Sequence, residues 1–524
     1  MDQNFLYGRS QSCISLWLER GLCTMTKFVF HGGVNEIGGN KILIEDSGTR
    51  VFLDFGLSFG QQREFYDEFL GARGFAIIEE YISFGLLPAV KGIYREDHLE
   101  HMRSSNPALG TSKKKSVEAV LMSHAHMDHV GMVPYLRPDI TLVSSETTWV
   151  IMKYLQETMT GDEQEFCTWY PSFKMTSRQR GGGLKRATKT DVEDEKIERP
   201  FVKTQRKRPF KVGNIEVTAY HVDHSLPGSD AYILNTDCGA VAYTGDLRFH
   251  GYFSSSSKEF LSALEGANVR VLLCEGTRAK DAPGMTEKNL EKEMTDTIEG
   301  SKALILVNYA QRDVSRMVTI SNAAHACGRK LLVSPKQAYF LSKMLQTKDI
   351  PAVDSKTIEV LLPRKSWGIW GNSDYDEEAQ LQDYSYSYPK PVREFVFEDS
   401  VLVTPQEVAK DQKEYVVTCS FYDLGILHDL KPREGSKFIW SASEPYDEEG
   451  AIELERVKNW LKHFGLGEPV MKHCSGHLSG RELKDLIERV KPEIVVPIHT
   501  EHPEVFKDWH RKVKVMERDA VLEI

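Results

Sequence analysis

The stretch Ser116–Gly131, SVEAVLMSHAHMDHVG, joins an apolar run to a cluster of metal-binding side chains. The run Val117–Met122 is mostly apolar and predicts a buried strand that stops at Ser123. Four potential ligands come directly after it: His124, His126, Asp128 and His129. Imidazole and carboxylate groups are the ligands that borderline divalent metals such as Zn²⁺ prefer. A solvated, histidine-rich turn is the alternative, but it does not explain this set behind a buried strand, so we expect a metal site there.

The composition is that of a globular protein. The chain has 524 residues, 41% hydrophobic and 27% charged, and this length predicts two or three domains. No apolar run approaches the ~20 residues of a membrane span, so we expect no membrane partner. The formal net charge of −10 argues against a surface coated in basic residues, so any nucleic acid would be held by a local groove and metal ions. The eight cysteines contain no CxxC pair, which favours reduced thiols and a cytoplasmic location.

The segments on either side of the metal-binding stretch differ in character. Residues 1–24 fit poorly with the rest of the chain and predict a weakly ordered extension. From Lys27 short strands alternate with Gly/Asn turns, and Asp54 closes one of these strands. Residues 174–211 mix charge with glycine, which is typical of a solvated insertion. A nucleic-acid contact in this insertion is the alternative for its basic residues Arg206, Lys207 and Arg208.

Further candidate ligands lie at the ends of later strands. His224 lies in HSLPGS and Asp246 in YTGDLRF, at the end of an apolar strand; His221 competes with His224 for the ligand role. Glu275 ends the apolar run VRVLLCE. The alternation of helices and strands over 285–350 predicts a small parallel sheet.

The closing segment HCSGHLSGRELKDLIERVKPEIVVPIHTEHP combines a helix, a strand and two histidines. Ser479 and Glu482 form a capping box, and apolar residues at helical spacing come after them. His477 therefore precedes a helix, and His499 ends the strand IVVPI. Two loop histidines without a special role are the alternative.

Taken in order, these motifs resemble the metallo-β-lactamase fold and its β-CASP branch, in particular the ribonuclease J-like enzymes of RNA metabolism. HAHMDH resembles the metal signature of that fold, HSLPGS the ribonuclease J segment HSIPDS, and SGH with PIHTE the closing segment. The resemblance implies an α/β protein: a metallo-β-lactamase αββα sandwich with an inserted β-CASP α/β domain. Residues 25–280 would form the first part of the sandwich, 281–465 the inserted domain and 466–524 the closing part.

The resemblance also implies roles for the candidate residues. Two divalent metal ions are expected, with zinc as the default and manganese as an alternative. One ion would be held by His124, His126 and His224, and the other by Asp128, His129 and His499, with Asp246 bridging them. Asp54 would support a ligand rather than bind metal. The implied catalytic residues are His477, Glu275 and Asp128. Glu275 would orient His477.

The implied activity is hydrolysis of phosphodiester bonds in single-stranded RNA by a metal-dependent ribonuclease. DNA-directed β-CASP enzymes usually lack a histidine at the position of His499, which favours RNA. A small-molecule hydrolase on the same fold is disfavoured by Glu275, His477 and the inserted domain. A non-catalytic RNA-binding subunit is a third alternative, disfavoured because no expected ligand is missing.

The glycine-rich TGSQGEP-like segment of ribonuclease J is replaced here by TCSFYDLG, which leaves exonuclease and endonuclease modes open. A monomer and a dimer both remain open. The candidate substrate-phosphate contacts are Ser420, Ser441 and Ser443.

Overall fold

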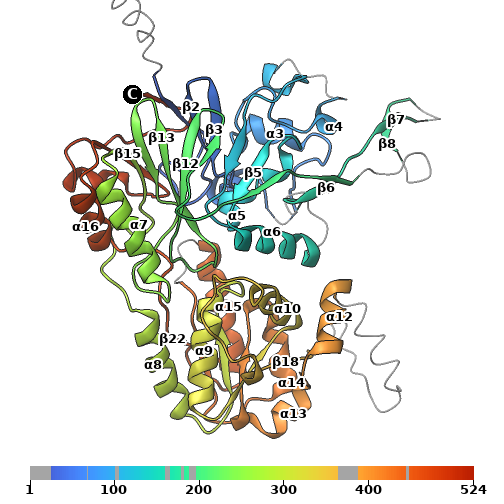
Figure 1. Ribbon diagram of the computed structural model, residues 1–524. Helices are drawn as coiled ribbons and strands as arrows, with labels where there is room; N and C mark the ends of the chain where they lie inside the picture. Colours follow the sequence, from blue (N-terminus) through green and yellow to red (C-terminus); the bar gives the residue numbers. More distant parts are fainter. Residues whose placement is uncertain are drawn as a thin grey trace, which may run out of the picture.

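The computed structural model of the chain describes residues 25–67, 69–100, 106–159, 166–178, 182–187, 196–363, 388–443 and 448–524. The expected extension over residues 1–24 lies outside these ranges. Three large sheets organise the described residues (Figure 1). None of the helices in these ranges is long and apolar enough to cross a membrane.

The first sheet carries the metal-binding stretch in its interior. Its antiparallel start, β1–β2–β3, continues into parallel pairs, and β4 lies between β3 and β5. The strand before the histidine cluster is therefore buried, as the apolar run predicts. In spatial order the strands are β10 (Phe201–Lys203), β5 (Thr141–Ser144), β4 (Ala119–Leu121), β3 (Thr49–Leu53), β2 (Ile42–Asp46), β1 (Lys27–Phe30) and β24 (Val521–Glu523).

The second sheet packs against the first. Alternate residues of β12, such as Val217, are buried and meet residues of the first sheet, such as Ile44, in one apolar core. In spatial order its strands are β11 (Phe210–Val212), β12 (Ile215–His221), β13 (Asp230–Thr236), β14 (Gly239–Tyr243), β15 (Val269–Glu275) and β23 (Ile494–Ile498).

Helices cover the outer faces of both sheets. On the second sheet, Phe260 of α7 and Leu486 of α16 share a core with Leu272 of β15. On the first sheet, Ile78 of α3 and Ile151 of α6 lie in a core with Val120 and Phe52. This arrangement of helices around two packed sheets confirms the expected αββα sandwich. The covering helices are α2 (Phe59–Phe65), α3 (Ile77–Ser83), α4 (Glu96–Leu99), α5 (Met127–Val130), α6 (Glu146–Thr158), α7 (Ser254–Gly266) and α16 (Gly480–Val490).

The third sheet is inserted between two neighbouring strands of the second. The chain leaves β15 at Glu275, builds an all-parallel sheet with helices, and returns to β23, which pairs with β15 in parallel. In Figure 1 this α/β domain forms the lower lobe, below α6. The small parallel sheet expected from helix–strand alternation is therefore present. Its strands in spatial order are β19 (Leu402–Val403), β18 (Ile358–Leu361), β17 (Lys330–Val333), β20 (Tyr415–Thr418), β16 (Ile305–Asn308), β21 (Lys437–Trp440) and β22 (Val470–Met471).

The helices of this lobe connect successive parallel strands, and α8 and α9 lie together on the way into the domain. They are α8 (Glu287–Glu299), α9 (Val314–Ala326), α10 (Pro335–Met344), α12 (Lys390–Asp399), α13 (Pro405–Lys410), α14 (Leu427–Leu430) and α15 (Glu448–His463).

The segment 174–211 differs from the expected solvated insertion in its described part. β10 pairs with β5 and β11 with β12, so this segment contributes an edge strand to each main sheet. Two short pairs, β6 (Trp169–Pro171) with β9 (Lys196–Glu198) and β7 (Met175–Ser177) with β8 (Leu184–Arg186), lie in and beside this segment. These strands are too short for an alternation of apolar and polar residues to be recognised among the charged residues. The sequence pattern therefore did not predict them.

Buried ion pairs join the sandwich to the inserted lobe. Arg206 donates to Asp230 (2.7 Å) and to both oxygens of Asp349, which lies beyond the end of α10. The pairs commit its guanidinium to an internal structural contact, and nucleic-acid binding by this basic run stays a prediction. Lys207 pairs with Glu259 on the surface (2.6 Å).

A second junction lies where the chain enters the lobe. Glu287, at the start of α8, accepts from Arg316 of α9 (2.9 Å) and from Arg248 of the sandwich (3.2 Å). Arg248 also donates to Asp223 (3.1 Å). All four side chains are buried, so the two lobes share a connected network of charges.

Candidate metal centre

The candidate ligands lie at the carboxyl ends of strands from both main sheets. His124 lies just past the end of β4, Asp246 past β14 and His499 past β23. β14, β15 and β23 are mutually parallel, so their carboxyl ends lie at one edge of the second sheet. The packing of the two sheets brings this edge to the end of β4, which is why ligands far apart in sequence meet.

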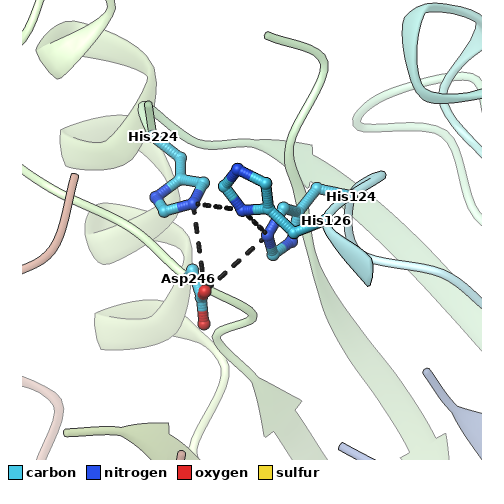
Figure 2. A group of neighbouring side chains, drawn as sticks. All are labelled: His124, His126, His224 and Asp246. Atoms are coloured by element: carbon cyan, nitrogen blue, oxygen red, sulfur yellow. Dashed lines mark hydrogen bonds and ion pairs between the residues drawn. The ribbon is translucent and has the colours of Figure 1, made fainter. Parts of the chain in front are cut away.

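One group contains His124, His126, His224 and Asp246, whose ligand atoms all lie within 4.8 Å of one another (Figure 2). His126 Nδ1 lies 2.9 Å from His124 Nε2 and 3.2 Å from His224 Nε2. Asp246 Oδ2 lies 3.7 Å from His124 Nε2 and 3.9 Å from His224 Nε2. Three imidazoles and one carboxylate thus point toward a common centre.

A second group contains Asp128, His129 and His499. His499 Nε2 lies 3.1 Å from Asp128 Oδ2. Asp246 Oδ2 is also close to this group, 3.2 Å from His129 Nε2 and 3.7 Å from His499 Nε2. A single carboxylate oxygen therefore faces both groups, which is the position expected of a bridging ligand.

The donor set fits divalent metal ions. Within the described part of the chain, Nε2 of His129 and Oδ1 of Asp246 are buried and have no hydrogen-bond partner. Burying such atoms without a hydrogen bond is unfavourable, and a cation at the centre would satisfy them. Neutral imidazole and ionised carboxylate are also the protonation states that bind metal.

Electrostatics favour those states in the first group. Burial lowers the pKa of His126 to about 4 and holds the pKa values of His124 and His224 well below the ordinary value. Burial acts to raise the pKa of Asp246, but the charges of His499 and His129 hold it well below its usual range. In the second group burial acts to lower the pKa of His129, yet three carboxylates raise it well above the ordinary value: Asp246, Asp128 and Asp54. This excess of negative charge around His129 favours a cation.

Asp54 lies behind His129, on the side away from the metal centre. Its Oδ2 lies 2.7 Å from His129 Nδ1 and accepts from the Ser123 hydroxyl (2.7 Å), and its Oδ1 accepts from the backbone N–H of Ser123 (2.6 Å). Tyr243 donates to the same carboxylate (2.5 Å). A carboxylate on the far nitrogen fixes the tautomer and direction of a ligating histidine. This geometry matches the supporting role expected for Asp54.

The Gly/Asn turn before Asp54 also shapes the site. Gly38 has φ +83°, and a Cβ there would lie 2.7 Å from Cβ of Asp128. A glycine is therefore required both by the left-handed backbone and by the close approach of a ligand.

His477 lies beside the ligands but is held differently. Its Nδ1 lies 3.4 Å from Glu275 Oε2 and 3.1 Å from the hydroxyl of Thr277. Its ring centroid is 4.9 Å from that of His224. The His477 side chain is 19% exposed, whereas that of Glu275 is fully buried. These contacts involve Nδ1 of His477 and not its Nε2.

Thr277 is a site residue that nothing in the sequence singles out. Its hydroxyl lies 2.8 Å from His499 Nδ1 and 3.0 Å from Glu275 Oε2, in addition to its contact with His477. It therefore links the candidate acid–base pair to a candidate ligand. The one available signal is its position two residues after Glu275, at the end of β15.

Other sequence candidates lie outside the cluster. His221 Nδ1 donates to the carbonyl of Ser229 (3.1 Å), and His221 belongs to neither ligand group. Ser420 donates to Asp423 in a capping box, and the Ser441 hydroxyl accepts from Arg316 (2.7 Å). The backbone carbonyl of Ser443 accepts from the indole of Trp440. Phosphate binding by these serines stays a prediction.

Comparison with known proteins agrees with this geometry. Residues 470–512, which include His477 and His499, match the Zn-dependent metallo-hydrolase RNA specificity domain. Ribonuclease J of Mycobacterium tuberculosis (strain CDC 1551 / Oshkosh) is 25% identical over 482 residues, covering 89% of this chain and 67% of that protein. Ribonuclease J of Pyrococcus abyssi is 22% identical over 491 residues, covering 91% of this chain and 90% of that protein.

The chain is also similar to a third ribonuclease J and to a solved structure. Ribonuclease J of Mycolicibacterium smegmatis is 25% identical over 308 residues, and the match spans 57% of this chain and 43% of that protein. A crystal structure of a protein of unknown function from Enterococcus faecalis V583 shares the fold: the TM-score is 0.66 at 21% identity, over 95% of this chain and 100% of that one. The chain is thus similar to ribonuclease J proteins over most of its length, which confirms its resemblance to the β-CASP, ribonuclease J-like metallo-hydrolases.

Proposed function

We propose that this protein is a metal-dependent ribonuclease that hydrolyses phosphodiester bonds of single-stranded RNA. The observation that carries the proposal is the pair of ligand groups that share Asp246, with His477 and Glu275 directly beside them. The match of residues 470–512 to an RNA specificity domain supports RNA as the substrate. Zinc is the preferred metal, manganese is the alternative, and we propose a cytoplasmic location.

Each group of residues has a distinct role in this proposal. Two bound divalent ions would lower the pKa of a water molecule and neutralise charge on the phosphorus. The ligands fix the position of those ions, and Asp54 and Thr277 fix the rings of His129 and His499.

His477 is the proposed acid. Glu275 and Thr277 engage its Nδ1, which leaves Nε2 to donate a proton to the leaving oxygen. Glu275 is also held by the backbone N–H of Thr277 (3.0 Å), so the pair is positioned before substrate binds. This pre-organisation supports the role of His477 as the acid, because its ring would not need to rearrange when substrate binds.

The proposal is tested by loading metal-free protein with Zn²⁺ or Mn²⁺ and comparing matched single-stranded RNA, single-stranded DNA and duplex RNA. We expect cleavage of the single-stranded RNA and little cleavage of the other two. A single strand can splay its bases where a rigid duplex cannot, and the 2′-OH distinguishes RNA from DNA. RNA with 5′-triphosphate, monophosphate or hydroxyl ends would separate exonuclease from endonuclease action. Equal cleavage of the DNA, or a preference for the duplex, would exclude the RNA assignment.

The same assay distinguishes an enzyme from a non-catalytic RNA-binding subunit. His477→Ala is the matched control, because it removes the proposed acid and leaves the ligand groups intact. RNA binding without cleavage by the metal-loaded wild type would favour the subunit. Cleavage that His477→Ala abolishes favours the ribonuclease.

A further inference from the structure

Arg312 lies in the short loop between β16 and α9, at the carboxyl edge of the third sheet. Asp313, the last residue of the loop, caps α9: its side chain accepts from the backbone N–H of Arg316 (2.9 Å). This contact fixes the end of the loop. Nη1 of Arg312 is buried, and within the described ranges no acceptor pairs with it. The cap thus fixes the backbone beside Arg312, and the guanidinium forms no ion pair with a described carboxylate.

The other arginines at the junction of the lobes are all paired. Arg206 contacts two carboxylates, Arg248 contacts Asp223 and Glu287, and Arg316 contacts Glu287. Removing a charge from water without a partner is expensive, so protein interiors rarely keep one unpaired. Nη1 of the half-buried Arg312 lacks such a partner among the described residues.

The groups around Arg312 belong to the sandwich rather than to its own lobe. Burial lowers the pKa of Arg312, and the opposing influences are Tyr154 of α6 and Asp128 of the second ligand group. Burial also holds the pKa of His126 near 4, and the Arg312 charge contributes to lowering it. Arg312 therefore lies within electrostatic range of the ligand loop His124–His129. Two neighbouring cationic groups repel each other, and an anion between them relieves that repulsion.

We propose that Arg312 binds a non-bridging phosphate oxygen of the RNA strand as that phosphate sits at the metal centre. This inference rests on the proposed ribonuclease function and identifies a substrate-positioning residue within it. The planar guanidinium offers a fork of donors that matches phosphate geometry, which a lysine ammonium does not. The inserted lobe would thereby hold the substrate from the side opposite the ligands.

The first test measures cleavage by metal-loaded Arg312→Met, Arg312→Lys and Arg433→Met. Arg433 is the matched control: it is exposed and precedes β21, at the amino edge of the third sheet, away from Arg312. A lost charge-assisted hydrogen bond should lower kcat/KM by about 10–100-fold in Arg312→Met. Arg312→Lys should recover part of this loss, and Arg433→Met should behave as wild type. Wild-type kcat/KM in Arg312→Met would overturn the proposal.

A second test uses RNA in which single phosphates are replaced by neutral methylphosphonates. Wild type should lose activity when the phosphate that meets Arg312 is neutral, whereas Arg312→Met should be indifferent to the same replacement. Equal sensitivity of both proteins at every position would refute a direct contact.

A third readout does not depend on RNA cleavage, so the inference can be separated from the ribonuclease proposal. Because Nη1 of Arg312 is buried without an acceptor among the described residues, Arg312→Met should unfold at the wild-type temperature or above it. Inorganic phosphate should raise the melting temperature of wild type more than that of Arg312→Met. If wild type cleaves no RNA, the function fails while this phosphate effect still tests Arg312. A clearly lower melting temperature with an unchanged phosphate effect would make Arg312 a structural residue.

Discussion

Replacing Glu287 at the junction of the two lobes tests how much its buried ion pairs stabilise the fold. Its carboxylate accepts from Arg316 (2.9 Å), from Arg248 (3.2 Å) and from the hydroxyl of Thr319 (3.0 Å). Glu287→Gln keeps the shape and removes the charge, which leaves two buried guanidiniums without their shared partner. Breaking a buried ion pair in this way costs about 3–5 kcal/mol.

The pKa of Glu287 gives a second estimate of this free energy. Burial acts to raise the pKa of Glu287, but Arg316 and Arg248 lower it from 4.5 to about 2. Each pKa unit is worth about 1.4 kcal/mol, so the pairing stabilises the folded chain by about 3 kcal/mol at neutral pH. The two estimates agree.

Urea unfolding monitored by tryptophan fluorescence would measure the difference. The control is Glu299→Gln, an exposed glutamate at the end of the same helix, whose effect should lie within about 0.5 kcal/mol. Because the folded pKa is lowered, the stabilisation is complete above about pH 4.5 and is lost as the pH falls toward about 2. The gap between wild type and Glu287→Gln should therefore close over that interval. A gap below about 1 kcal/mol at pH 7, or one that widens in acid, would refute the assignment of this network as stabilising.

Three further outcomes concern the metal centre. Asp246→Ala should lower the content of both ions, because one carboxylate oxygen faces both ligand groups; elemental analysis that finds one site still filled would argue against bridging. Asp54→Asn should weaken metal affinity by about 10–100-fold in a chelator competition, since it removes the charge that directs His129, and unchanged affinity would show that the contact is dispensable. His477→Ala should lower turnover by about 10²–10⁴-fold while metal content stays at the wild-type level, and a loss of metal would instead identify His477 as a ligand.

The two candidate ligand groups could be predicted from the sequence because most of their members lie at or just beyond strand ends. An apolar run that stops at a polar residue indicates both a strand and its edge, as at Ser123 and before His499. The order of the motifs then indicates which edges meet. His221 and His224 could not be separated from their spacing alone, and the structure places His224 in the first ligand group.

Contacts that depend on the packing of distant elements were not predictable in the same way. Thr277 and Arg206 act through partners that lie up to 222 and 143 residues away. Neither residue type is unusual at its position, so no local pattern marks it. The strands of 174–211 were missed for a different reason: short edge strands carry charged residues that resemble a solvated loop.

The arginines at the lobe junction differ in their acceptors, and this difference cannot be predicted from the sequence. In the sequence, Arg312 and Arg316 lie close together, and no local pattern distinguishes their roles. In the structure, Arg316 fills its donors with Glu287, Ser441 and Cys474, whereas Nη1 of Arg312 has no acceptor among the described residues. The first arrangement stabilises the fold and needs nothing further. The second leaves a buried donor without an acceptor, and the proposed contact with a substrate phosphate would supply one.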